Sequence, residues 1–155
     1  MEIPSVEQVG ALISASEPRM AAFVALCAFA GLRLGEASAV TVDDVDFLRR
    51  RLDVRRQVQR ARGGPAEIRP PKYESERTVY LPDRLVRMLA VHVERLGVAP
   101  EGWLFFGGDG RAIAPSTVNA WWQRTVKDAG VDGLHIHGLR HFYASGLIAA
   151  GCDVV

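Results

Sequence analysis

Cysteine is scarce in this 155-residue chain, and long apolar runs are missing from it. Two cysteines, Cys27 and Cys152, cannot form the disulfide framework of a small secreted protein, so we expect a reducing, cytoplasmic location. No apolar run is long enough to cross a bilayer and no signal peptide is recognisable, which argues against a membrane protein. Linkers, internal repeats and low-complexity runs are also lacking. The length fits one domain, residues 1–155, with a substantial core.

Net charge is small as well, at +1, but its distribution along the chain is uneven. Residues 49–77 hold ten basic side chains and four acidic ones, a local charge of +6. A basic window inside a balanced protein can bind a polyanion without making the whole surface basic. The same pattern also fits a solvated β-ribbon with arginines on its wet face, and charge alone does not separate the two readings.

Apolar residues recur at helical spacing through most of the chain, which predicts a mainly helical fold. The expected helices open with a capping box or a proline at the first turn, and most of them end at glycine. We expect helices at Ser5 onward with a capping box to Gln8, from Pro18 to Gly31, over residues 37–40, from Pro82 to Gly97, from a Ser116 cap to Gly130, and after His135. Cys27, Trp121 and Trp122 are expected in the core.

Between Val45 and Leu81 the period of the apolar residues shifts toward two, which is typical of strands. Apolar positions such as Leu52 and Val54 alternate with arginines there, and residues 78–81 form another extended run. These segments predict a small antiparallel sheet of about three strands. The expected fold class is therefore α+β, mainly helical with a small three-stranded antiparallel sheet.

Two clusters could in principle bind a metal ion. Three aspartates lie within residues 43–46, but they lack the ordered ligand spacing of a calcium loop. Three histidines within residues 135–141 could surround zinc, yet no carboxylate or cysteine completes the set and Arg140 adds a cation beside them. These histidines are His135, His137 and His141. A metallohydrolase therefore stays an alternative reading, and we expect no metal and no other cofactor.

A histidine and an arginine near the C-terminus form the leading candidate site. Residues 135–141 read His-Ile-His-Gly-Leu-Arg-His and lead into an apolar segment that suits a helix. His137 and Arg140 are three apart, so on a helix they share a face. Fixed guanidinium donors beside a side chain that exchanges protons near neutral pH suit the binding of an anion.

Three motifs, in this order, resemble the tyrosine recombinases, the phage integrase family. Residues 30–46, which begin Ala-Gly-Leu-Arg-Leu-Gly-Glu, resemble the family's first arginine motif. Residues 72–81, Lys-Tyr-Glu-Ser-Glu-Arg-Thr-Val-Tyr-Leu, resemble its β-hairpin lysine segment, and residues 135–141 resemble its His-x-x-Arg box. The resemblance runs from about Ile3 to Val155. It implies the recombinase catalytic-domain fold, double-stranded DNA as the partner and no small-molecule substrate.

The resemblance implies catalytic roles for four residues. Arg33 and Arg140 would hold the non-bridging oxygens of a pentacoordinate phosphorane, whose extra charge needs such donors. Lys72 would protonate the departing 5′ oxygen, and His137 would assist proton transfer or brace the phosphate. Glu36 would orient the fold or an arginine. DNA contacts are expected from the basic window, at Arg55, Arg56, Arg60, Arg62, Lys72 and Arg77.

The resemblance also implies parts that this sequence does not contain. In the family, a further histidine or tryptophan and the nucleophilic tyrosine follow the His-x-x-Arg helix, whereas this sequence stops at Val155. Tyr143 matches a core aromatic position, so we assign it to packing, and Tyr73 and Tyr80 fall in the hairpin. We therefore expect an incomplete catalytic domain, without the N-terminal core-binding domain, of a nucleoid-associated recombinase that acts as a homotetramer on DNA. The alternative is a non-catalytic DNA-binding remnant of an integrase.

Overall fold

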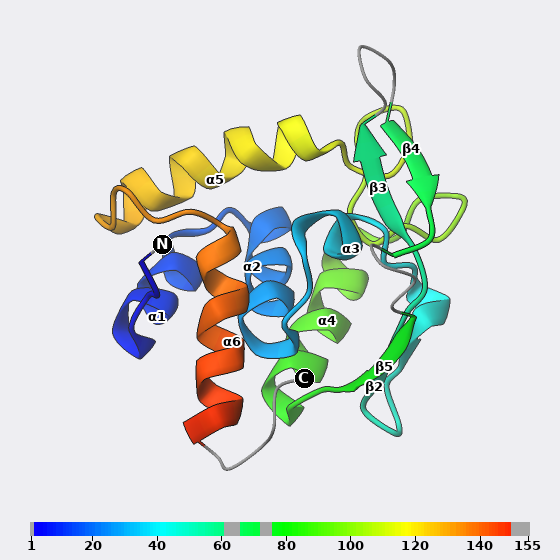
Figure 1. Cartoon of the computed structure of the whole chain (residues 1–155). Helices are drawn as coiled ribbons and strands as arrows, with labels where there is room; N and C mark the ends of the chain where they lie inside the picture. Colours follow the sequence, from blue (N-terminus) through cyan, green and yellow to red (C-terminus); the bar gives the residue numbers. More distant parts are fainter. Residues whose placement is uncertain (1, 61–65, 72–75, 150–155) are drawn as a thin grey trace.

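The computed structural model describes residues 2–60, 66–71 and 76–149. Its elements confirm the mainly helical α+β class (Figure 1). In chain order they are α1 (Val6–Ala15), α2 (Pro18–Ala30), α3 (Leu34–Ser38), the 3₁₀ turn η1 (Val42–Asp44), β1 (Val45–Asp46), β2 (Arg51–Val54), β3 (Gln57–Arg60), β4 (Ala66–Arg69), β5 (Arg77–Tyr80), α4 (Asp83–Leu96), α5 (Pro115–Ala129) and α6 (His137–Ala149). None of the helices in these ranges is long and apolar enough to cross a membrane.

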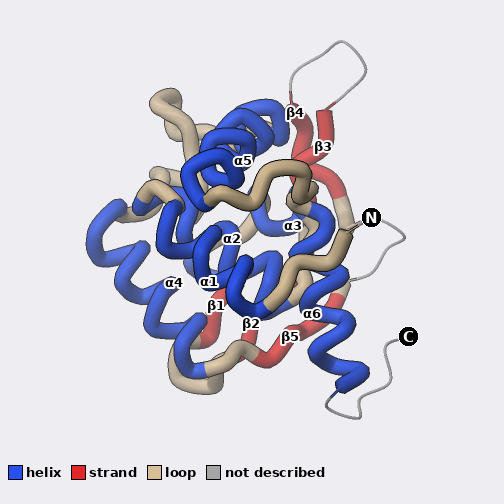
Figure 2. The backbone as a smooth tube through the Cα atoms, turned by 90° about the vertical axis from the view of Figure 1, so that its left-hand side faces the viewer, coloured by secondary structure: helices blue, strands red, loops and turns tan. Residues whose placement is uncertain are grey.

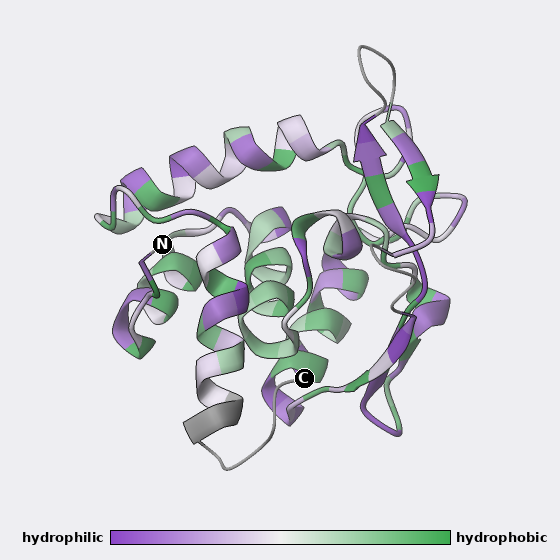
Figure 3. Cartoon of the chain, in the orientation of Figure 1, coloured by the Kyte–Doolittle hydropathy of each residue, from purple (hydrophilic) through white to green (hydrophobic). Residues whose placement is uncertain are grey.

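Helix α2 forms the centre of the core because it is apolar on nearly every side. Helices α1, α4 and α6 pack against it, and Figure 3 shows it as a largely hydrophobic helix enclosed by more polar elements. Its side chains Phe23, Val24 and Leu26 are fully buried. Cys27 is buried as predicted; burial, with a smaller contribution from the Glu36 charge, raises the pKa of its thiol to about 12.

Strands β1, β2 and β5 form the predicted three-stranded antiparallel sheet. Leu52 on β2 lies opposite Val79 on β5, and both side chains are buried against the helices. Among the described residues, strands β3 and β4 pair with each other as a separate ribbon beside α3 (Figure 2). The second sheet was not expected, because alternation within a strand does not say which strand it pairs with.

A glycine allows α3 and the β3–β4 ribbon to approach closely. A Cβ atom at Gly35 would lie 2.7 Å from the carbonyl oxygen of Val58, closer than ordinary packing permits. Gly35 stands between Arg33 and Glu36, so the backbone that carries these two residues is held directly against the ribbon. Gly35, the glycine of the first arginine motif, is therefore needed because a larger residue would not fit against the ribbon.

Helix α1 begins with the predicted capping box. The N–H of Gln8 donates to Oγ of Ser5 at 3.1 Å, and the N–H of Ser5 donates to Oε1 of Gln8 at 2.8 Å. The predicted start of α5 was wrong by two residues. The helix begins at Pro115 and not after a Ser116 cap, because proline has no N–H to lose and suits the first helical position.

The short helix α3 was also misplaced by the sequence reading, which expected residues 37–40. It spans Leu34–Ser38, because Oε1 of Glu36 accepts the N–H of Arg33 at 3.0 Å and so caps the helix one turn earlier. The same carboxylate therefore shapes the backbone and, as described below, the charge of the site.

Both tryptophans of α5 lie in the core, as predicted. Trp122 is 2% exposed and its Nε1 donates to the carbonyl oxygen of Leu134 at 3.0 Å. Trp121 is buried too, with the guanidinium of Arg19 4.2 Å above its ring. Their indole faces are thus unavailable for stacking on bases.

Candidate active site

One buried carboxylate, Glu36, gathers three guanidinium groups from three separate elements. Arg77 on β5 donates from Nη1 to Oε2 at 2.8 Å and from Nη2 to Oε1 at 3.0 Å. Nη1 of Arg33 lies 3.6 Å from Oε2, and Nη1 of Arg140 lies 3.9 Å from Oε1. Glu36 is 1% exposed, whereas each arginine side chain is about 30% exposed. The four side chains leave a net charge of +2 that opens to the surface.

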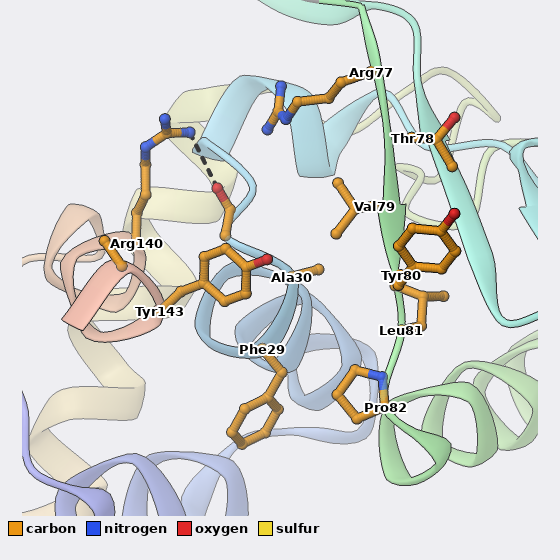
Figure 4. A pocket seen from close by; sticks show the side chains of 12 residues that line it. Phe29, Ala30, Arg77, Thr78, Val79, Tyr80, Leu81, Pro82, Arg140 and Tyr143 are labelled. Carbon is orange, nitrogen blue, oxygen red and sulfur yellow. Dashed lines mark hydrogen bonds between the residues drawn. The ribbon is translucent and has the colours of Figure 1, made fainter. Parts of the chain in front are cut away.

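Local geometry brings these side chains together. Arg33 directly precedes α3, three residues before Glu36, and Arg140 lies in the first turn of α6. The Nη1 atom of Arg140 donates to the carbonyl oxygen of Gly31 at 3.0 Å, which ties α6 to the end of α2. Figure 4 shows Arg77 and Arg140 reaching from β5 and α6 toward α3. Two of the predicted catalytic residues, Arg33 and Arg140, therefore share one carboxylate.

The electrostatics of the cluster favour a bound anion. Burial by itself would raise the pKa of Glu36, but hydrogen bonds from Arg77 and from the backbone N–H of Arg33 outweigh burial and hold that pKa below its usual value. Burial and the charge of Arg33 lower the pKa of Arg140. Crowded cations with one counter-charge are stabilised when an anion such as a phosphate supplies another.

His137 stands at the start of α6, on the face that it shares with Arg140. Its ring meets the ring of His141 edge-on, with centroids 5.0 Å apart. His135 precedes the helix and is exposed. Across the described ranges, no three histidine, cysteine, aspartate or glutamate side chains come close enough to hold a metal ion. The ligand set that a metallohydrolase would need is thus not assembled by these residues.

A cavity of about 610 Å³ opens beside the arginine cluster, between α2, β5 and α6 (Figure 4). Apolar side chains such as Phe29 and Val79 line it, together with Arg77 and Arg140. Tyr143 also lines it, and its ring packs against Gly31 in the packing role that the sequence suggested. The arginine cluster therefore borders an open cavity whose walls are largely apolar.

Two of the arginines predicted to contact DNA pair with buried carboxylates within the protein. Arg56 donates from Nη1 to Oδ2 of Asp44 at 2.6 Å and to the carbonyl oxygen of Ala39 at 3.2 Å. Asp44, one of the three aspartates considered for metal, also accepts the N–H of Thr41 at 2.9 Å. Arg77 belongs to the Glu36 cluster. Both arginines consequently support the fold around the site.

The other predicted DNA contacts differ in position. Arg55 is exposed and pairs with Asp53 at 3.0 Å, and Arg60 is exposed at the end of β3. Arg62 and Lys72 lie outside the described residues.

The link between Arg77 and Glu36 escaped the sequence reading, which counted Arg77 as one charge in the basic window. The alternation of side chains along the strand could have revealed this link. Arg77 and Val79 are two apart on β5, so they share a strand face, and Val79 is buried. An arginine on the inward face of a strand needs a buried acceptor, and Glu36 is that acceptor.

Gly31 is a sensitive point of the site, and replacing it with alanine is expected to destabilise the protein by about 2 kcal/mol. Its φ of +71° lies in the left-handed region, and a Cβ there would overlap the Tyr143 ring. Urea unfolding measures the change. Gly10 is the control, because it lies within α1 with open space around it, so Gly10→Ala should stabilise by about 0.5–1 kcal/mol. Equal effects of both changes would contradict the assignment.

Comparison with known proteins matches this chain to one family. The model of the phage integrase family matches residues 5–155. A tyrosine recombinase from Thermosipho africanus is 29% identical over 147 residues, covering 94% of this chain and 46% of that protein. The chain spans about half or less of the length of the curated relatives that it matches.

Solved structures share the fold. The XerA recombinase superposes with a TM-score of 0.80 at 24% identity, covering 99% of this chain and 53% of that one. The Tn1549 transposon integrase, in complex with a circular intermediate DNA, gives a TM-score of 0.83 at 20% identity, covering 98% of this chain and 55% of that one. Because the family model matches nearly the whole chain, this chain belongs to the phage integrase family.

Proposed function

We propose that this chain is the catalytic domain of a site-specific DNA recombinase, the part that binds double-stranded DNA and activates the scissile phosphate. The observation that carries the proposal is the convergence of Arg33 and Arg140 on Glu36 at a partly exposed, net positive site. A phosphodiester fits such a site because guanidinium groups bind phosphate oxygens through paired N–H donors. The DNA complex of the Tn1549 integrase, which shares the fold, supports DNA as the partner.

In the proposed reaction, a tyrosine hydroxyl attacks the scissile phosphorus and forms a 3′-phosphotyrosine bond while the bond to the 5′ oxygen breaks. Arg33 and Arg140 stabilise the charge that develops on the non-bridging oxygens of the phosphorane. His137 assists removal of the tyrosine proton or braces the phosphate, and Lys72 protonates the 5′ oxygen. Attack by a 5′ hydroxyl of the partner strand reverses the step and joins the exchanged strands. The phosphotyrosine bond conserves the energy of the phosphodiester, so rejoining needs no nucleotide, and in this proposal the arginines and not a metal ion stabilise the developing charge.

DNA binding by residues 1–155 is expected to be weak, indifferent to sequence and strongly dependent on salt. If the basic window, including Arg55 and Arg60, neutralises about four phosphates, affinity should fall roughly 10²-fold between about 50 and 200 mM salt. Fluorescence anisotropy with an arbitrary duplex measures this. Arg55→Gln or Arg60→Gln should each lower the salt slope by about one, whereas Arg95→Gln on α4, away from the basic window, should not. An affinity that is insensitive to salt would count against a phosphate-binding surface.

Catalysis is tested by trapping. The full-length protein, incubated with a nicked duplex that lets the cleaved strand diffuse away, should form a covalent protein–DNA adduct that survives denaturant and is removed by protease. DNA binding without any adduct would favour the non-catalytic remnant.

A homotetramer on two duplexes is the expected assembly, and analytical ultracentrifugation of the DNA complex checks it.

A further inference from the structure

We propose that Arg77 is a positioning residue of the phosphate site, which holds the Glu36 carboxylate in place and thereby orders Arg33 and Arg140 for the anion. This proposal rests on the recombinase function proposed above and deepens it. It gives Arg77 a role other than the direct DNA contact that the charge pattern suggested. In this role Arg77 touches neither the phosphate nor the nucleophile.

The distances divide the work among the three arginines. Arg77 makes two charge-assisted hydrogen bonds to the carboxylate, at 2.8 and 3.0 Å. Arg33 and Arg140 stand at 3.6 and 3.9 Å from the same oxygens, close enough for attraction but beyond good hydrogen-bond length. Arg77 and the backbone N–H of Arg33 therefore fill three of the roughly four acceptor positions of Glu36. The other two guanidinium groups keep donors for an external anion, since each carries five N–H groups.

Burial explains why this arrangement depends on Arg77. Glu36 is shielded from water, so losing the two Arg77 hydrogen bonds would raise the pKa of its carboxyl and leave it neutral over a wider range of pH. A neutral Glu36 no longer attracts Arg33 and Arg140. These two cations repel each other, because both guanidinium groups lie within 4 Å of the same carboxylate. The pair of phosphate donors would then move apart.

A simpler role for Arg77 is that of a strap between β5 and α3, because the ion pair joins residues 41 positions apart. A strap and a positioning residue differ in their response to pH. Loss of a strap weakens the fold as a whole, and by the same amount at every pH at which Glu36 is ionised in the folded protein. Loss of a positioning residue makes the order of Arg33 and Arg140 depend on the protonation of Glu36.

Nuclear magnetic resonance of residues 1–155 separates these roles without DNA. The Glu36 Cδ shift reports its titration, and the Nε–H signals of Arg33 and Arg140 report their order. In Arg77→Met, Glu36 should titrate at higher pH than in the native protein, and both arginine signals should exchange faster as it becomes protonated. Arg77→Lys keeps the charge but loses the planar fork of donors, so its Glu36 should titrate between the native protein and Arg77→Met.

Matched variants decide the outcome. Arg111→Met removes a cation from an exposed pair at 4.0 Å and should change none of these signals. Unchanged titration of Glu36, or unchanged Arg33 and Arg140 signals, in a folded Arg77→Met protein would overturn the proposal. If Arg77→Met does not fold, Arg77→Lys decides. Native-like Glu36, Arg33 and Arg140 signals in that variant would show that the two hydrogen bonds of Arg77 are not needed, and would overturn the proposal.

Kinetics of the full-length protein connect the position to the reaction. Arg77→Met should lower kcat for strand cleavage on the order of 10- to 10²-fold with little change in KM, because misplaced donors cost transition-state stabilisation. The loss should deepen as the pH falls, and Arg77→Lys should restore part of the rate. An equal loss at all pH values would identify a strap. If the native protein shows no cleavage, the recombinase function fails, while the magnetic resonance result still decides the role of Arg77.

Discussion

Alanine in place of Arg140 is expected to slow DNA strand cleavage by the full-length protein by about 10²–10³-fold. The side chain is fixed before substrate arrives, by a 3.0 Å hydrogen bond to the carbonyl oxygen of Gly31 and by attraction to Glu36. A preorganised donor acts mainly on the transition state, because the extra charge of the phosphorane is absent from the bound DNA. Single-turnover cleavage at saturating DNA isolates this effect on the chemical step.

Three further variants are measured beside Arg140→Ala. Arg33→Ala removes the other proposed phosphate donor and should cause a loss of similar size, whereas Arg111→Ala on the surface should not. Arg140→Lys retains a positive charge but not the fork of donors, so it should recover only a part of the rate. Cleavage that survives both Arg33→Ala and Arg140→Ala would show that the cluster does not bind the scissile phosphate.

Replacing Glu36 with glutamine is expected to lower the free energy of unfolding by about 3 kcal/mol, the lower end of the range for breaking a buried ion pair. The change leaves three guanidinium groups without their shared counter-charge. The lower end applies because each arginine side chain is about 30% exposed and can regain some hydration. Urea unfolding of residues 1–155 measures the difference.

The pH dependence of this difference follows from the direction of the Glu36 shift. Its pKa is lower in the folded protein than the ordinary value of 4.5. A carboxyl of this kind stabilises the folded state above its unfolded pKa, and this stability is lost as the pH falls through the folded pKa. The gap between native protein and Glu36→Gln should therefore be constant near neutral pH and shrink below about pH 4.5.

A surface acid provides the control for Glu36. Asp109 is 64% exposed and lies 4.0 Å from Arg111, so Asp109→Asn should cost under about 1 kcal/mol. If Glu36→Gln were equally mild, the carboxylate would not organise the cluster. The repulsion among the three arginines would then be balanced by something other than Glu36, and the positioning role of Arg77 would lose its basis.

Local features of this protein were determined by the sequence alone. The Ser5 capping box and the left-handed Gly31 that ends α2 depend on residues within about one helical turn, so their signals survive without the fold. The order of the three motifs likewise identified the family, with Arg33 and Arg140 as phosphate ligands still to be tested. Where a local contact was overlooked, as with the cap that Glu36 makes on Arg33, the predicted helix was displaced by one turn.

Only the tertiary structure decided which charges meet. The contact of Arg77 with Glu36 spans 41 residues, and that of Arg140 with Gly31 spans 109. A count of charge in the basic window treats Arg55, Arg56 and Arg77 alike, yet packing buries the acids Asp44 and Glu36 beside two of them. Burial makes an ion pair strong and an unpaired charge costly, and burial is a property of the folded chain. The arrangement of the site therefore follows from how α2, α3, β5 and α6 pack together.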